Sequence, residues 1–253
     1  TSSMVTVNSV NVNAPGTYTV TYNVTDAAGN ASAQRVRVVN VVNTPPVITI
    51  LGENLVTHEA ATPYTDAGAS AVDSLDGNLP VVVGNPVDVN QPGSYTVTYN
   101  ATDSGGLDAE ASRTVNVIDT TAPVITLLGE ASVNHEAGTA YTDVGATASD
   151  SLDGDLSGSI VVSNPVDVNV PGSYTVTYNV SDAAGNPAAQ VSRSVTVVDT
   201  TAPVITLLGD AIVNHEAGAP YTDAGATASD SLDGDLSSDI VTGGSVDVDV
   251  PGT

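Results

Sequence analysis

Cysteine, tryptophan, phenylalanine and lysine are all absent from the chain, and methionine occurs once in 253 residues. Without cysteine the chain has no disulfide and no thiol chemistry. Tyrosine is the only large aromatic residue, so a single large aromatic core is excluded, whereas several small cores of valine, isoleucine, leucine and tyrosine are feasible. No stretch of ten residues has the apolar spacing of an amphipathic helix. The many valine and threonine residues favour strands instead, because β-branched side chains suit a pleated surface.

Positive charge is scarce as well. The chain has 29 acidic residues and only four basic ones, and its formal net charge at pH 7 is -25. The four are Arg35, Arg37, Arg113 and Arg193. A surface this negative repels nucleic-acid phosphates and anionic membranes, so we expect no nucleic-acid partner and no membrane insertion. High ionic strength or bound divalent cations make such a charge tolerable, and the charge also serves solubility by itself.

A long repeat organises the sequence. The string Asp-Thr-Thr-Ala-Pro-Val-Ile-Thr-Leu-Leu-Gly begins at Asp119 and again, 80 residues later, at Asp199. The motif Tyr-Thr-Val-Thr-Tyr-Asn begins at Tyr18, Tyr95 and Tyr174, with spacings of 77 and 79 residues. Two independent markers therefore give nearly the same period.

The repeat divides the chain into four parts. Residues 43–118 and 119–198 are two whole modules, 1–42 are the C-terminal half of a module, and 199–253 are the N-terminal half of another. Because the chain begins and ends within the pattern, we expect it to belong to a longer protein, and its lack of a signal peptide or lipidation motif says nothing of location. Each half lacks strands that a sandwich needs, so we expect the halves to be less stable than the whole modules. In principle the halves can complement each other, within one chain or between chains, but we interpret such pairing as an artefact of where the sequence is cut.

Short strands separated by turn signals fill the module 119–198. Tyr174, Val176 and Tyr178 alternate with polar residues, a period of two that turns one face of the strand inward. Pro-Gly precedes this strand, and a hairpin turn from Asp182 to Asn186 follows it. The strands predicted in the module are 124–128, 132–136, 141–148, 160–163, 166–169, 173–181 and 190–198.

This pattern predicts an all-β fold of tandem immunoglobulin-like β-sandwich modules, 77–80 residues each, in a linear array. Tyr174, directly after Pro-Gly at a strand start, has the position of a tyrosine corner, in which the hydroxyl bonds nearby backbone. The cysteine pair and the tryptophan of antibody domains are missing, so the likeness to those domains is one of architecture.

A specific set of motifs recurs along the modules. In 119–198 it comprises Thr121-Ala122-Pro123-Val124-Ile125, Glu136-Ala137-Gly138, Tyr141-Thr142-Asp143, Asp153-Gly154-Asp155-Leu156, Gly172-Ser173-Tyr174-Thr175-Val176-Thr177-Tyr178 and the turn from Asp182 to Asn186. Over essentially the whole chain these motifs resemble the bacterial immunoglobulin-like domain of surface proteins and secreted hydrolases, first described from a pesticidal crystal protein, and they are similar to hyalin repeats. The resemblance implies accessory or structural repeats in an extracellular protein and no catalytic residue.

Clustered acids are the strongest candidates for a functional site. Each module carries an acidic turn around Asp-Gly; its residues are Asp150, Asp153 and Asp155, with the equivalents Asp73, Asp76 and Asn78, and Asp230, Asp233 and Asp235. Carboxylates at this density supply several oxygens to Ca²⁺, although the spacing is not that of an EF-hand. The alternative is a hydrophilic turn in which Asp-Gly supplies a positive φ.

The module junctions are a second candidate for calcium. Asp119 and Asp199 begin the repeats, while Asp182 and Glu136 lie where they can approach a junction. Bridging carboxylates would stiffen a joint that is otherwise mobile. The module 43–118 departs from this pattern, because its leading residue is Asn43.

Each whole module contains one histidine and one arginine, and both are interpreted as structural. His135, for example, precedes a glutamate, but no second histidine lies at zinc-ligand spacing. Arg37, Arg113 and Arg193 share one repeat position and predict a cross-strand ion pair, worth about 0–1 kcal/mol if it is exposed, with ligand recognition as the alternative. No Ser-His-Asp order, phosphate loop or cysteine site is visible, so the pattern is not that of an enzyme.

These patterns favour a non-catalytic extracellular spacer, secreted or on a bacterial cell surface, which projects a functional domain or mediates adhesion and is stiffened by calcium. Its expected partners are neighbouring modules of the same protein, with a cell-surface protein or a glycan as further candidates. The alternative is a set of carbohydrate-binding accessory modules of a secreted hydrolase. Sugar binding needs exposed aromatic platforms, and only Tyr64, Tyr141 and Tyr221 are candidates, because the tyrosines of 173–181 face the core.

Overall fold

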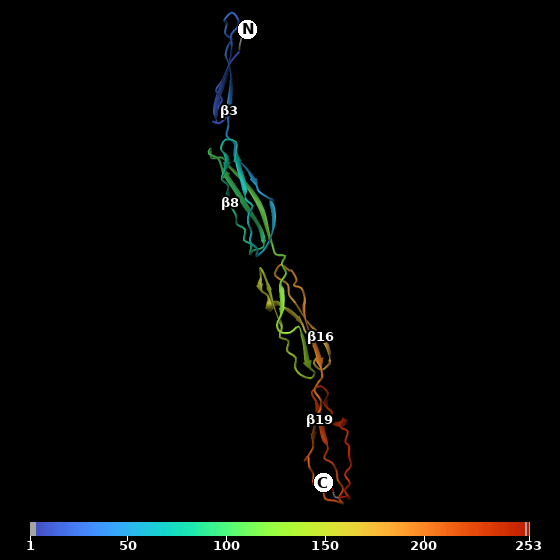
Figure 1. The fold of residues 1–253 in the computed structure, drawn as a ribbon. Helices are drawn as coiled ribbons and strands as arrows, with labels where there is room; N and C mark the ends of the chain where they lie inside the picture. The colour runs from blue at the N-terminus through green and yellow to red at the C-terminus, as the bar shows by residue number, and fades with distance from the viewer. Residues whose placement is uncertain (1–3, 251, 253) are drawn as a thin grey trace. The chain divides into compact units, whose positions relative to one another are not determined.

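The computed structural model describes residues 4–250 and 252, and in it the chain consists mainly of β-strands and turns (Figure 1). Two compact units, Thr1–Thr120 and Thr121–Thr253, make up the chain. The helices of the described part are two 3₁₀ turns, η1 (Ser157–Ser159) and η2 (Ser237–Asp239). No helix in that part has the length and apolar character needed to cross a membrane.

The first unit opens with one antiparallel sheet. β1 (Met4–Asn8) pairs with β2 (Gly16–Val24), and β2 pairs with β3 (Arg35–Val41). Only Val20 of these strands is buried. Residues 4–42 form no second sheet, so the apolar side chains of this one are largely in contact with solvent.

Residues 43–118 form two sheets that pack on each other. The first sheet has the order β4-β6-β7 and consists of β4 (Val47–Ile50), β6 (Ala69–Asp73) and β7 (Gly77–Leu79). The second has the order β5-β10-β9-β8 and consists of β5 (Leu55–Glu59), β8 (Val82–Gly84), β9 (Gly93–Thr102) and β10 (Asp108–Ile118). β5 and β10 run parallel, and the other pairs are antiparallel.

In the second unit, residues 119–198 repeat this arrangement. The first sheet, of order β11-β13-β14, contains β11 (Val124–Leu127), β13 (Ala146–Asp150) and β14 (Gly154–Asp155). The second, of order β12-β17-β16-β15, contains β12 (Ser132–Glu136), β15 (Val161–Ser163), β16 (Gly172–Asn179) and β17 (Val191–Val198). β12 runs parallel to β17. Residues 199–250 form only a first sheet, of order β18-β19-β20, from β18 (Val204–Leu207), β19 (Ala226–Asp230) and β20 (Gly234–Asp235).

Alternation along the strands fills the interior of the module 119–198. Val176 and Tyr178 of β16 and Val195 of β17 have no exposed surface, and they meet Ile125 and Ala148 from the first sheet. A period of two puts every second side chain on the inner face, and the inner faces of both sheets share one core. The predicted fold of tandem immunoglobulin-like sandwiches is confirmed.

The predicted tyrosine corner is also confirmed. The Tyr174 hydroxyl donates to the carbonyl oxygen of Val170 at 2.8 Å. Tyr18 and Tyr95 make the same bond four residues upstream, at 2.9 and 2.8 Å. Each bond fixes the entry into the long strand of the second sheet.

Two predicted strands differ from the structure because local side chains compete for the backbone. The strand predicted over 141–148 begins only at Ala146, since the Asp143 carboxylate accepts the Gly145 amide and Gly145 has a φ of 80°. The strand predicted over 166–169 does not form, because the side chains of Asn164 and Asp167 accept amides two residues downstream. Polar residues that cap their own backbone thus convert short apolar runs into turns.

Candidate functional site

The first aspartate of each acidic turn organises that turn. Asp73 Oδ1 accepts the backbone amides of Leu75 and Asp76 at 2.7 and 3.0 Å. Asp150 and Asp230 each make the same pair of bonds two and three residues downstream. These bonds hold the pKa of Asp73 below its ordinary value, the Asp76 amide making the largest contribution.

The other oxygen of each of these carboxylates, Oδ2, makes no such bond. Oδ2 of Asp73, Asp150 and Asp230 is inaccessible to solvent and has no hydrogen-bond partner among the described residues. A buried carboxylate oxygen without a partner is costly, and a cation is the natural way to satisfy it. The feature recurs in all three acidic turns.

Three carboxylates of the second unit converge at the junction before β18. Asp199, Asp230 and Asp233 each offer an oxygen that lies within 4.8 Å of the other two. Like charges at this distance repel one another unless a cation lies between them. The two calcium candidates of the sequence, the acidic turn and the linker aspartate, therefore combine into one group here.

The remaining acids of these turns have other partners. Asp155 Oδ1 accepts the Ser157 amide and hydroxyl at 2.9 and 2.6 Å, and Asp235 binds Ser237 in the same way. Asp153 Oδ2 accepts the amide of Ala183 at 2.8 Å, which ties the acidic turn to the hairpin turn between β16 and β17. Asp76 accepts the amide and the hydroxyl of Ser104, which ties the acidic turn of the module 43–118 to the turn between β9 and β10.

Glu136, which ends β12, holds the linker rather than joining the aspartate group. Its carboxylate accepts the amides of Thr200 and Thr201 at 2.9 Å each and both hydroxyls at 2.7 Å. These bonds, those from Thr200 foremost, lower the pKa of Glu136 to about 2. In the first unit Glu59 binds the amide and hydroxyl of Thr120 at 2.9 and 2.7 Å. We call this arrangement the glutamate clasp.

Backbone packing tightens the same junction. A Cβ built on Gly138 would lie 2.4 Å from the Ser231 carbonyl oxygen, and Gly138 has a φ of 69°. Only glycine fits there, because both the close approach and the left-handed backbone exclude a side chain. The clasp, this contact and the Asp199–Asp230–Asp233 group all lie where residues 119–198 meet residues 199–253.

The other predicted junction residues are placed as follows. Asp182 closes its own hairpin turn, accepting the Asn186 amide at 2.7 Å and the Asn186 side-chain amide at 2.8 Å. Asn43 donates to Asp103 Oδ2 at 2.7 Å, so an amide takes the linker position in the first unit. Asp119 lies in the first unit, whereas its repeat partners Asp150 and Asp153 lie in the second.

The ion pairs predicted for Arg113 and Arg193 form, but not across neighbouring strands, and the two side chains are buried, with 2% and 1% of their surface exposed. Arg113 Nη1 donates to Asp66 at 2.6 Å, and Arg193 Nη1 to Asp143. Asp66 and Asp143 lie in loops that lead into the first sheet of their modules, whereas the two arginines lie on strands of the second sheet. Each ion pair therefore joins the two sheets of its module. The sequence patterns assigned no role to these aspartates, although both whole modules combine a Tyr-Thr-Asp motif with one arginine in a chain poor in basic residues.

Further hydrogen bonds complete this network in the module 119–198. Tyr178 donates to Asp143 Oδ2 at 2.6 Å, Tyr141 to Oδ1 at 3.2 Å, and Arg193 also bonds the Leu128 carbonyl. Burial pushes the pKa of Asp143 upward, but the bonds from Tyr178 and Arg193 outweigh it and hold that pKa below its ordinary value. In the first unit, burial and Asp66 raise the pKa of Tyr99 to about 12. Asp143, Tyr178 and Arg193 thus bond one another inside the module 119–198.

The histidines lie outside the acidic turns. His135 Nε2 is 3.0 Å from the Thr139 carbonyl oxygen, and its ring meets Tyr141 edge-on at 5.2 Å. His58 and His215 repeat both contacts. Each histidine therefore braces the turn that follows its strand.

Closed sandwiches that recur along the chain, each with its own Arg-Asp-Tyr network, define a tandem array of immunoglobulin-like repeats. The chain belongs to the family described as "Bacterial surface protein, Ig-like domain", whose model matches residues 1–41, 48–117, 125–197 and 205–253.

Similar proteins occur in bacteria and in sea urchins. The chain is 32% identical over 260 residues to the pesticidal crystal protein Cry22Aa of Bacillus thuringiensis, covering 98% of this chain and 35% of that protein. It is 32% identical over 240 residues to hyalin of Strongylocentrotus purpuratus, covering 84% and 19%. Internalin I of Listeria monocytogenes serotype 4b (strain F2365) is 28% identical over 230 residues, with 85% and 12% covered. The chain thus spans about a third or less of the length of these relatives.

Proposed function

We propose that this chain is a non-catalytic, extracellular spacer that projects a functional domain from a bacterial surface or mediates adhesion. The observation that carries the proposal is that the polar network inside the whole modules stabilises the fold: Arg193, Asp143 and Tyr178 form hydrogen bonds with one another inside the sandwich. Membership of a surface-protein family and the likeness to internalin I support an extracellular position.

Calcium is proposed as the stiffening ion at the junction before β18. Asp199, Asp230 and Asp233 are the proposed ligands, with Asp119, Asp150 and Asp153 as their repeat equivalents. The fit rests on hard oxygen donors within 4.8 Å of one another and on the buried, unpartnered Oδ2 of Asp230. Since Asp199 precedes the clasped Thr200, an ion there would couple the linker to the acidic turn of the next repeat.

Calcium titration tests the metal part directly. We expect Ca²⁺ to raise the melting temperature and to slow amide exchange at Thr200 and Leu232 in the chain, and a chelator to reverse both effects. Asp233→Asn should abolish the exchange response at Thr200 and Leu232, whereas Asp210→Asn, which removes an exposed charge outside the group, should leave that response intact. Identical melting and exchange with and without Ca²⁺ would contradict the calcium proposal and leave the spacer proposal standing.

Glycan binding, the alternative interpretation, finds little support in the tyrosines. The hydroxyls of Tyr64, Tyr141 and Tyr221 bond aspartates two residues downstream, and none of the three is fully exposed. A flat exposed aromatic platform is what sugars usually stack on. A glycan array probed with the chain should give no specific hit, and a reproducible hit that Tyr141→Ala removes would favour the accessory-module interpretation.

A further inference from the structure

The acidic turn of the module 43–118 contains a buried carboxylate that its neighbours satisfy only in part. Asp73 is 3% exposed, and its Oδ1 accepts the amides of Leu75 and Asp76. Its Oδ2 is inaccessible to solvent and has no hydrogen-bond partner among the described residues. Neither Asp73 nor Asp76 forms an ion pair within the part of the chain that the structure describes. A buried negative charge is therefore left without full compensation.

A proton does not satisfy this oxygen. The amides of Asp76 and Leu75 hold the pKa of Asp73 below its ordinary value, so the carboxylate is charged at neutral pH. Arg113, the only arginine of the module 43–118, binds Asp66 instead. A charged oxygen that is shielded from water needs a cation or a polar hydrogen, and the module supplies neither at Asp73 Oδ2.

A second buried oxygen without a partner belongs to Asn43. This residue follows Arg37 by six positions, the spacing at which Asp199 follows Arg193, so Asn43 holds the linker position of its module. Its Nδ2 donates to Asp103 Oδ2 at 2.7 Å, whereas its Oδ1 is inaccessible to solvent and accepts no hydrogen bond from the described residues. The donated bond fixes the amide, so the oxygen of Asn43 faces away from Asp103.

Hydrogen bonds hold these two residues at the same end of the module. Asp103, the partner of Asn43, begins the turn between β9 and β10. The next residue, Ser104, donates its amide and its hydroxyl to Asp76 at 2.9 and 2.8 Å. Asp76 in turn donates its own amide to Asp73 at 3.0 Å. A continuous series of bonded neighbours thus runs from Asn43 through the hairpin turn to Asp73.

The corresponding group near β18 shows how close such oxygens come. Three carboxylate oxygens there lie within 4.8 Å of one another, and they belong to Asp199, Asp230 and Asp233, the repeat equivalents of Asn43, Asp73 and Asp76. Asp230 accepts two backbone amides at 2.7 and 3.1 Å, almost as Asp73 does, so the two turns have the same conformation. The same turn therefore brings one amide oxygen and two carboxylates together in the module 43–118.

An exchange of side chains accounts for the amide at position 43. In the module 119–198, Asp182 accepts the side-chain amide of Asn186, four residues downstream. The equivalent of Asn186 is Leu107, whose side chain has no donor, and Asn43 supplies the donor to Asp103 instead. The asparagine lies in the linker rather than in the hairpin turn, and it keeps its oxygen available as a ligand.

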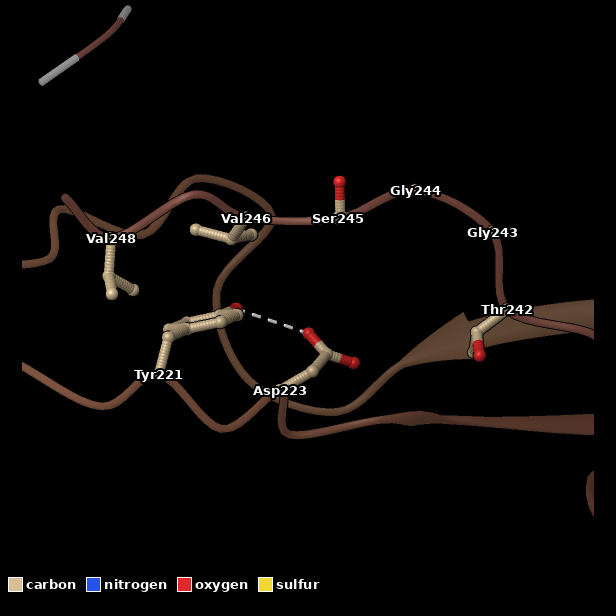
Figure 2. Close-up of a pocket in the computed structure, with 8 residues that line it drawn as sticks. All are labelled: Tyr221, Asp223, Thr242, Gly243, Gly244, Ser245, Val246 and Val248. Atoms are coloured by element: carbon tan, nitrogen blue, oxygen red, sulfur yellow. Dashed lines mark hydrogen bonds between the residues drawn. The ribbon is translucent and has the colours of Figure 1, made fainter. Parts of the chain in front are cut away.

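A pocket elsewhere in the chain shows that an acid in a hollow need not have an unpartnered oxygen. Asp223 and Tyr221 line this pocket (Figure 2). The two oxygens of Asp223 accept the Tyr221 hydroxyl at 3.2 Å and the Gly225 amide at 2.9 Å. Asp73 differs, because only one of its oxygens accepts hydrogen bonds.

We propose that the module 43–118 binds a Ca²⁺ ion of its own, coordinated by Asn43 Oδ1, Asp73 Oδ2 and the Asp76 carboxylate. Amide and carboxylate oxygens are hard donors, and Ca²⁺ takes about six to eight oxygens in a flexible geometry, which backbone carbonyls and water complete. The ion compensates the buried charge of Asp73 and ties the linker residue to the acidic turn.

The amide makes this site weaker than the group at Asp199, because two carboxylates attract Ca²⁺ less than three. The chain then has two classes of calcium site. This comparison rests on the calcium part of the proposed function, whereas the site at Asp73 does not.

Calcium titration of the whole chain, followed amide by amide through hydrogen exchange, tests the site. We expect a Kd of about 0.1–1 mM, the range of extracellular calcium modules. At a free Ca²⁺ concentration of about ten times the Kd, the Leu75 and Asp76 amides should exchange about tenfold more slowly. The Thr200 and Leu232 amides report separately on the junction group and should respond at lower Ca²⁺ concentrations.

Asp73→Asn tests the ligand while keeping the turn. The asparagine oxygen can still accept the Leu75 and Asp76 amides, but its nitrogen takes the place of Oδ2 and cannot bind a cation. This variant should lose the calcium response at Asp76 and keep the response at Thr200. Without Ca²⁺ its Asp76 amide should exchange no faster than in the unmodified chain, because an uncompensated buried charge is gone.

Asp88→Asn is the matched control. Asp88 lies in the same module, is exposed, and accepts the Asn90 amide at 2.9 Å, two residues downstream as in the acidic turn. This variant removes one negative charge and should keep the full calcium response at Asp76.

A gain of affinity tests the role of Asn43. The double variant Asn43→Asp, Leu107→Asn gives the module 43–118 the linker acid and the hairpin donor of the module 119–198. With a third carboxylate in the site, its Kd for Ca²⁺ should fall by at least about tenfold. Circular dichroism checks that each variant folds.

Several results would overturn the site. Exchange at Asp76 could be the same with and without Ca²⁺ up to about 10 mM, ten times the weakest expected Kd, which would indicate a buried water between the two oxygens. Asp73→Asn could retain the calcium response, or it could speed exchange equally with and without Ca²⁺, as a turn cap alone would. A response at Asp76 without one at Thr200 would support this site and contradict only the junction site, so the two proposals fail separately.

Discussion

Replacing Arg193 by methionine removes the guanidinium that joins the two sheets of the module 119–198. Arg193 is buried and bonds Asp143, the Tyr178 hydroxyl and the Leu128 carbonyl. Breaking a buried ion pair by removing one partner costs about 3–5 kcal/mol, because a buried charge remains uncompensated. Tyr178 and Tyr141 would still donate to Asp143, so the expected loss is at the lower end, about 3 kcal/mol.

Native-state hydrogen exchange is the appropriate assay, because it reports on one module within a chain of several. A loss of about 3 kcal/mol raises the opening constant of β16 and β17 by more than about 100-fold. Arg37→Met, the same change at the exposed repeat position, should alter exchange in its own strands by less than about tenfold.

The double variant Arg193→Met, Asp143→Leu discriminates further. Removing both charges leaves no unpaired carboxylate, so the module should recover part of the lost protection. The reasoning fails if Arg193→Met accelerates exchange of β16 and β17 by less than about tenfold, or if the double variant is no better protected than the single one.

Three further predictions concern the junction and the strand entry. The glutamate clasp should be fully formed above pH 4.5, the ordinary pKa of a glutamate, and should be lost as the pH falls through about 2, the pKa of Glu136. NMR of the Glu136 carboxyl group and amide exchange at Thr200 will follow the loss, and a titration midpoint near 4.5 would contradict the prediction. Gly138→Ala should destabilise the junction by about 1–3 kcal/mol, because the added Cβ clashes with Ser231. Gly154→Ala is the control: Gly154 has a φ of 74° and an added Cβ there meets no atom within 4 Å, so this variant should show backbone strain alone. Equal effects of the two variants on the melting temperature would refute the contact. Tyr174→Phe should cost about 1 kcal/mol in denaturant unfolding, because the Val170 carbonyl loses its donor, and no change would mean that the corner contributes nothing.

The fold was largely predictable because its signals are local. The strand predicted over 132–136 coincides with β12, and Tyr178 faces the core as its alternation requires. Misassigned strands arose where Asp143 or Asp167 bonds its own backbone, an effect that apolar patterning does not report.

The polar networks were harder to predict because their partners are distant in sequence. Arg193 and Asp143 are 50 residues apart and meet only when the sheets stack. Likewise Asp199 comes close to Asp230 and Asp233 only because β18 and β19 pair. From the sequence alone, the linker aspartate and the acidic turn were therefore predicted as two separate calcium sites. Whether these carboxylates bind calcium stays a prediction.

The parallel pairing of β12 with β17 has a mechanical consequence. β12 follows the entry of the module and β17 leads to its exit, so tension on the two ends pulls these neighbours in opposite directions along their shared axis. Five paired positions are then sheared together rather than peeled apart one at a time. Rupture under force is governed by the rate of unfolding, so a module closed in this way resists stretching far longer than its equilibrium stability alone would indicate.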